Sequence, residues 1–114
     1  MTYIVISILL LVVAGAVGVA NFVRRSGGKA VSRVAGYAHG VVALAAFVLL
    51  IASYSPSSPN WAYRLLALAL IAGLVFFGIN LATRKPPAWL GLVHGILGLA
   101  GLVLLVVVAF TGVG

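Results

Sequence analysis

Four stretches of this chain are apolar and long enough to cross a lipid bilayer. About 20 helical residues span the ~30 Å hydrocarbon layer. Lipid offers no hydrogen-bond partners to a bare backbone, so each stretch must be helical. The sequence therefore predicts an all-α membrane protein, an up-down bundle that forms one domain over residues 1–114. The predicted spans are Tyr3–Val23, Val34–Ser53, Ala62–Thr83 and Ala88–Thr111.

The composition excludes several other classes of protein. Of the 114 residues, 65% are hydrophobic and 6% charged, whereas soluble domains carry about 25% charged residues. The net charge of +7 comes from cations in the short gaps between apolar runs, so we expect no nucleic-acid partner. The chain has no cysteine, Asp or Glu. This excludes thiolate metal sites and carboxylate chemistry, and we expect no catalytic activity beyond electron transfer.

The cations also predict the topology. Six of the seven lie in the loops 24–33 and 84–87, and Arg64 is the exception. Positively charged short loops stay on the cytoplasmic side. We therefore expect an integral protein of the bacterial inner membrane, with both loops cytoplasmic and both termini extracytoplasmic. The first run has no basic segment before it, which favours a retained helix over a cleaved signal peptide.

The sequence contains an internal repeat. Residues 36–50 match residues 91–105 at eight of fifteen positions, and both segments contain Gly-x-x-His-Gly. A weaker similarity relates Ala14-Gly15 to Ala72-Gly73, and each pair precedes an Asn. We interpret the chain as one helical hairpin used twice, over residues 1–54 and 61–114.

The few polar residues within the spans form the candidate site. The only two histidines are His39 and His94. Together with Asn21 and Asn80 they are expected about 5–12 Å from the cytoplasmic boundary, at 1.5 Å per helical residue. Polar groups in hydrocarbon normally face the interior and are candidate functional residues. Small residues accompany each histidine, and these are Gly36 and Gly40 for His39, and Gly91, Gly95 and Gly98 for His94.

This pattern favours a haem site. A haem iron with two axial imidazoles needs one neutral histidine on each side, and a lane of glycines leaves room for a flat ring. Asn21 or Asn80 would hold the second imidazole nitrogen. Cations such as Arg24, Arg33, Arg84 or Lys85 would pair with the propionates.

The arrangement resembles the haem-carrying four-helix membrane bundles of the cytochrome b class. The resemblance rests on His39, His94, their glycines and the helix order. It implies bis-histidine ligation of haem b and electron exchange with a quinone or a redox-partner protein. Those cytochromes generally hold two haems, whereas this chain has one histidine pair and hence one expected haem.

Other interpretations stay open. The histidines could bond to the asparagines or to each other and simply fix helix packing, in a structural or accessory membrane subunit. They could line a quinone or small-molecule pocket, hold chlorophyll-type pigments, or serve metal or proton transport. Two histidines make a poor zinc site, which takes three or four protein ligands. The chain could also be a subunit of a larger membrane complex or a homo-oligomer.

Overall fold

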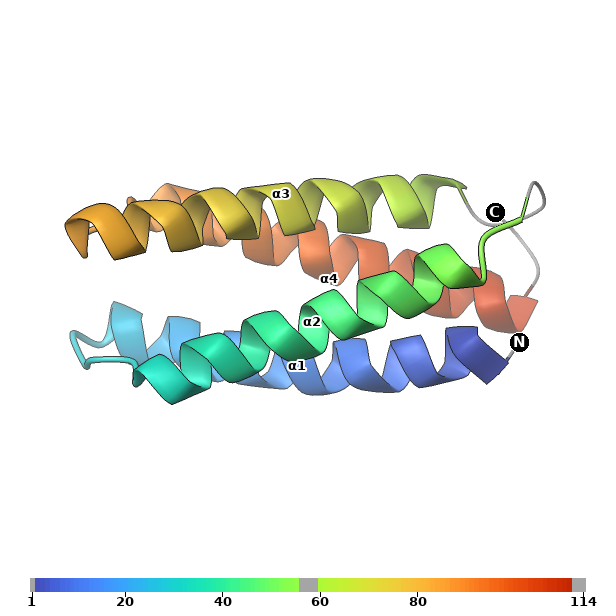
Figure 1. The fold of residues 1–114 in the computed structure, drawn as a ribbon, viewed down its shortest axis with the longest axis horizontal. Coiled ribbons are helices and arrows are strands. Elements are labelled where there is room, and N and C mark those ends of the chain that lie inside the picture. Colours follow the sequence, from blue (N-terminus) through green and yellow to red (C-terminus); the bar gives the residue numbers. More distant parts are fainter. Residues whose placement is uncertain (1, 56–59, 112–114) are drawn as a thin grey trace. The chain divides into compact units, whose positions relative to one another are not determined.

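The protein is all-helical in the described residues of the computed structural model, 2–55 and 60–111 (Figure 1). All four helices are long and apolar enough to cross a membrane, which confirms the predicted class of fold and is consistent with an integral membrane protein. No strand occurs within the described ranges. The helices are α1 (Thr2–Ser26), α2 (Arg33–Ala52), α3 (Asn60–Thr83) and α4 (Ala88–Thr111).

The chain divides into two compact units, each containing one helical hairpin. The first unit, Met1–Ser58, contains α1 and α2, and the second, Pro59–Gly114, contains α3 and α4. Within each unit the two helices run antiparallel, side by side (Figure 1). Short turns between consecutive helices enforce this pairing.

Small side chains line the contact between the two helices of each hairpin. Ala14 and Ala46 are buried in the first hairpin, and Ala69 and Gly101 in the second. Small residues let helix backbones approach closely, and lipid itself gives apolar helices little reason to associate otherwise. These small residues therefore allow the two helices of each hairpin to pack closely.

The surfaces outside these contacts are strongly apolar. Val34 and Phe110 are each 77% exposed, and many other large hydrophobic side chains are more than 40% exposed. Such a surface would be very unfavourable in water, and contiguous apolar patches of this size mark membrane or protein contacts. The hydrocarbon chains of lipids can cover this apolar surface without any protein partner.

The turn from α1 to α2 is closed by a glycine in the left-handed region. The Lys29 N–H donates to the Arg24 carbonyl at 2.9 Å, and the Gly28 N–H donates to the Arg25 carbonyl at 3.1 Å. These are the two bonds of a Schellman motif. Gly28 holds φ 76°. The α2 helix then begins with Ser32, whose hydroxyl accepts from the Ala35 N–H at 3.1 Å.

The turn from α3 to α4 uses an arginine in the same role. The Arg84 N–H donates to the Asn80 carbonyl at 3.0 Å, the single bond of an αL helix cap. Arg84 adopts φ 60° and is the one non-glycine residue with positive φ in the described part of the chain. A residue with a Cβ is strained in this region by roughly 1–2 kcal/mol.

We predict that Gly28→Ala lowers the free energy of unfolding by about 1 kcal/mol, the penalty of a Cβ at positive φ. A Cβ at Gly28 would meet no atom within 4 Å, so the cost is that of the backbone alone. Gly27→Ala is the matched control, since its Cβ would make ordinary contacts at 3.5 Å or more. Unfolding in mixed detergent micelles measures both. Equal stability of the two variants would contradict the assigned turn.

We predict that Arg84→Gly raises the free energy of unfolding by about 1 kcal/mol, because glycine removes the strain at φ 60°. Arg84→Gln removes the charge but keeps the Cβ, so it should leave stability near that of the parent. The same micelle unfolding assay compares the two. If Arg84→Gly is no more stable than Arg84→Gln, backbone strain at this position does not lower the stability.

Candidate functional site

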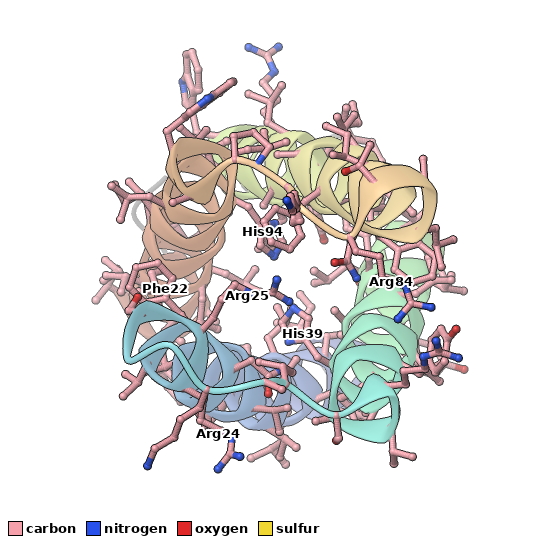
Figure 2. The ribbon with its side chains drawn as sticks, turned by 90° about the vertical axis from the view of Figure 1, so that its left-hand side faces the viewer. Phe22, Arg24, Arg25, His39, Arg84 and His94 are labelled. Atoms are coloured by element: carbon pink, nitrogen blue, oxygen red, sulfur yellow. The ribbon has the colours of Figure 1, made fainter. Side chains whose placement is uncertain are left out.

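His39 bonds across the first hairpin, from α2 to the backbone of α1. Its Nδ1 lies 2.7 Å from the carbonyl oxygen of Ala14. A carbonyl oxygen only accepts hydrogen bonds, so the imidazole donates through Nδ1–H. Figure 2 shows the ring on the side of α2 that faces α1.

His94 makes the same bond in the second hairpin, from α4 to α3. Its Nδ1 lies 2.7 Å from the carbonyl oxygen of Ala69, and Figure 2 shows it reaching from α4 toward α3. Each histidine is 25 residues beyond its acceptor. Each is also the seventh residue of its helix, since α2 starts at Arg33 and α4 at Ala88. Both imidazoles therefore lie at the same depth in their hairpins, about 9 Å from the helix start.

These bonds fix the tautomer of both rings. A neutral imidazole whose Nδ1 carries the proton has its lone pair on Nε2. Histidines that ligate metals commonly have this form, with Nδ1–H donated to a backbone carbonyl and Nε2 directed at the metal. In each hairpin the imidazole thus donates from Nδ1 to a carbonyl of the neighbouring helix.

A glycine on the neighbouring helix makes room for each imidazole. A Cβ at Gly18 would lie 2.9 Å from Cε1 of His39, and one at Gly73 would lie 2.8 Å from Cε1 of His94. Real Cβ atoms essentially never approach so closely. Each ring therefore lies directly against helix backbone, and only glycine permits the distance that the Nδ1 bond needs.

Sequence reasoning did not identify Gly18 and Gly73 as contacts of the histidines, because it aligned the first and third helices at the wrong offset. The weaker similarity aligned Ala14-Gly15 with Ala72-Gly73, at an offset of 58. The structural equivalents are Ala14 with Ala69 and Gly18 with Gly73. Both pairs differ by 55, the offset that also relates His39 to His94. Applying the stronger repeat to the whole hairpin would have found both glycines.

The glycines predicted to accompany the histidines divide into two groups. Gly91 and Gly98 face their own partner helix, since a Cβ there would lie 3.2 Å from Phe76 and 3.9 Å from the Cβ of Ala69, respectively. The second group, which a Cβ would leave in open space, contains Gly36, Gly40 and Gly95. The first group thus serves close helix packing, while the second leaves flat backbone uncovered.

The two asparagines are not equivalent in the structure. Asn21 is half-buried, and its side-chain amide donates to the Ala35 carbonyl at 3.5 Å. At the offset of 55, its counterpart is Phe76, which packs on Gly91. Asn80 is half-buried near the end of α3. The sequence predicted an asparagine as the partner of the second imidazole nitrogen. In the structure, Nδ1 of each histidine bonds to a backbone carbonyl.

Cations stand at the turn end of each hairpin, beyond the histidines. Arg24 and Arg25 point to opposite sides of the end of α1 (Figure 2), and the Arg24 guanidinium donates to the Ala30 carbonyl at 3.4 Å. Arg84 follows α3 (Figure 2). Among the described residues no cluster of three or more metal-ligating side chains occurs.

Comparison of the chain with models of known protein families, with curated proteins and with solved structures finds no match.

We predict that Gly18→Ala lowers the free energy of unfolding by about 1 kcal/mol. The added Cβ displaces the His39 ring and breaks its bond to Ala14, and such bonds average ~0.6 kcal/mol in membranes with a maximum near 1.7. Gly73→Ala should cost the same in the second hairpin. Unfolding in mixed micelles measures the change.

Gly15→Ala and Gly78→Ala are the matched controls, because a Cβ at either position meets no atom within 4 Å. Both should be as stable as the parent or slightly more so, since alanine favours the helix. A Gly18→Ala protein as stable as Gly15→Ala would contradict the proposed packing of imidazole on backbone.

Proposed function

We propose that the chain is a small integral-membrane cytochrome of the b type, in which His39 and His94 are the two axial ligands of one haem. The observation that carries this proposal is the pair of matched imidazoles, each with Nδ1 bonded at 2.7 Å to a carbonyl of the adjacent helix. That bond orients the ring and leaves the lone pair on Nε2, the atom that ligates haem iron.

The repetition of this cluster supports a planar ligand with two equivalent faces. The acceptor, the glycine and the histidine recur at one offset, as Ala14, Gly18 and His39 in the first hairpin. We infer that the hairpin is a unit used twice, which would present the same half-site to each face of a porphyrin. The glycines with open faces, Gly36, Gly40 and Gly95, would let the ring approach helix backbone.

The rest of the chain suits the same function. A bound haem supplies one-electron chemistry. The protein contributes binding, orientation of the imidazoles and an apolar setting, and its turn cations would neutralise the propionates. Electrons would pass to or from a quinone or a redox protein, with the basic loops on the cytoplasmic side of a bacterial inner membrane. The chain contains no Asp, Glu or Cys, so carboxylate or thiolate catalysis is not part of this proposal.

A second candidate function is a non-redox membrane subunit. It is favoured by the fact that each imidazole bonds within its own hairpin. The same bond fixes the register of two helices whether or not the other ring nitrogen holds a metal. In that case the histidines would only fix helix pairing, and the protein would be colourless.

The visible absorption spectrum separates the two functions. Protein produced with ample haem and purified in mild detergent should show the Soret and α bands of a low-spin, six-coordinate haem. His39→Ala or His94→Ala alone should leave at most a five-coordinate, high-spin haem, because one axial ligand is lost. The double variant should be colourless.

Arg64→Gln is the control for this experiment. Arg64 stacks over Trp61 at 5.1 Å at the start of α3, nine residues before Gly73, beside which His94 lies, so its loss should leave the spectrum unchanged. A colourless parent protein would refute the haem proposal. So would Soret and α bands that persist in the double variant.

A further inference from the structure

We propose that the turn between α3 and α4 is a binding site for the phosphate of an anionic phospholipid headgroup, with Arg84 and Lys85 as its cationic ligands. It does not rest on the haem proposal, in which Arg24 and Arg33 of the other turn would neutralise the propionates. Three observations carry the proposal: the charge balance of the chain, the strained backbone of Arg84, and the rigid frame that surrounds both cations.

The chain cannot neutralise these cations with side chains of its own. It contains seven Lys and Arg residues and no Asp or Glu. Arg84 and Lys85 are both exposed and adjacent in sequence. No carboxylate side chain of the chain can therefore pair with them, whereas a phosphate accepts the guanidinium and ammonium donors well.

The backbone of Arg84 indicates that its side chain has a role. The residue adopts φ 60°, where glycine would be unstrained and any Cβ costs stability. The other hairpin closes its turn with Gly28 at the corresponding left-handed position. Strained residues of this kind occur where function requires the side chain. Here the arginine supplies one of the two cations in the turn.

The turn holds both cations in a fixed frame. The Arg84 N–H is bonded to the Asn80 carbonyl, and the Lys85 N–H donates to the hydroxyl of Thr83 at 3.1 Å. That hydroxyl donates in turn to the Ile79 carbonyl at 2.9 Å. Pro86 and Pro87 follow, and they have no N–H to satisfy and little backbone freedom. The backbone donors of the turn are thus used internally, and the two cationic side chains are left to bind the ligand.

The length of the helices places this turn at headgroup depth. At 1.5 Å per residue, the 24 residues of α3 and of α4 each extend about 36 Å, longer than the ~30 Å hydrocarbon layer. Trp89 follows the turn directly and is 65% exposed, as is typical of tryptophan at the membrane interface. A cation at this depth meets lipid phosphates before any soluble anion, so the proposed ligand is a lipid.

Trp89 provides the assay. In a Trp61→Phe protein it is the only tryptophan, and phospholipids brominated on their acyl chains quench it when they bind beside the turn. The protein is reconstituted in mixtures of a zwitterionic lipid with brominated phosphatidylglycerol or brominated phosphatidylcholine. We expect the relative binding constant of the anionic lipid at Trp89 to be at least fivefold higher, on the scale of about fivefold for each cation near the surface.

Matched variants identify the ligands. Arg84→Gln with Lys85→Gln should reduce the preference to about onefold, and Arg84→Lys should retain it, because the charge is kept. Arg64→Gln should have no effect, since Arg64 lies near the other end of α3. Raising the salt concentration toward 1 M should weaken the preference, because the Debye length falls to about 3 Å.

Three outcomes would overturn the proposal. Equal quenching by the anionic and zwitterionic lipids would show that the turn does not select anionic lipid. A preference that survives the double Gln variant would assign it to other residues. Loss of the preference in inorganic phosphate, but not in chloride of equal ionic strength, would show that the turn binds free phosphate instead.

Discussion

The hydrogen bond between an imidazole and a helix carbonyl is the interaction on which each hairpin depends. In hydrocarbon the Nδ1–H of histidine has no water to bond, so it must find an acceptor in the protein. A helix carbonyl already accepts one backbone bond but has a second lone pair. Reaching it at 2.7 Å requires that the neighbouring helix lack a Cβ at Gly18 or Gly73. Histidine, glycine and acceptor are therefore interdependent.

This constraint links packing to the proposed chemistry. The bond that links the two helices also places a proton on Nδ1, so in the proposed function the same residue would ligate through Nε2. The apolar outer surfaces and the basic turns serve a different purpose. They match the hydrocarbon layer and its charged boundary, and they leave His39 and His94 among the few polar side chains in the middle of the helices.

Much of the fold could be predicted from the sequence, because a bilayer permits few alternatives to an apolar helix. The four apolar helices follow from hydropathy, and the two matching sequence segments drew attention to His39 and His94. The acceptors Ala14 and Ala69 could not be predicted, because they act through backbone carbonyls that every residue possesses. The role of Arg84 in a left-handed turn was equally hidden, since glycine is the usual residue there.

The tautomer of the two histidines tests this account most directly. Solid-state ¹⁵N NMR of histidine-labelled protein in lipid bilayers distinguishes protonated from unprotonated ring nitrogens. The account predicts that both His39 and His94 are neutral with the proton on Nδ1, and that the Nδ1–H of each ring shows contact with the Ala14 or Ala69 carbonyl. A proton on Nε2 in either ring, or a ring that exchanges between the two tautomers, would contradict it.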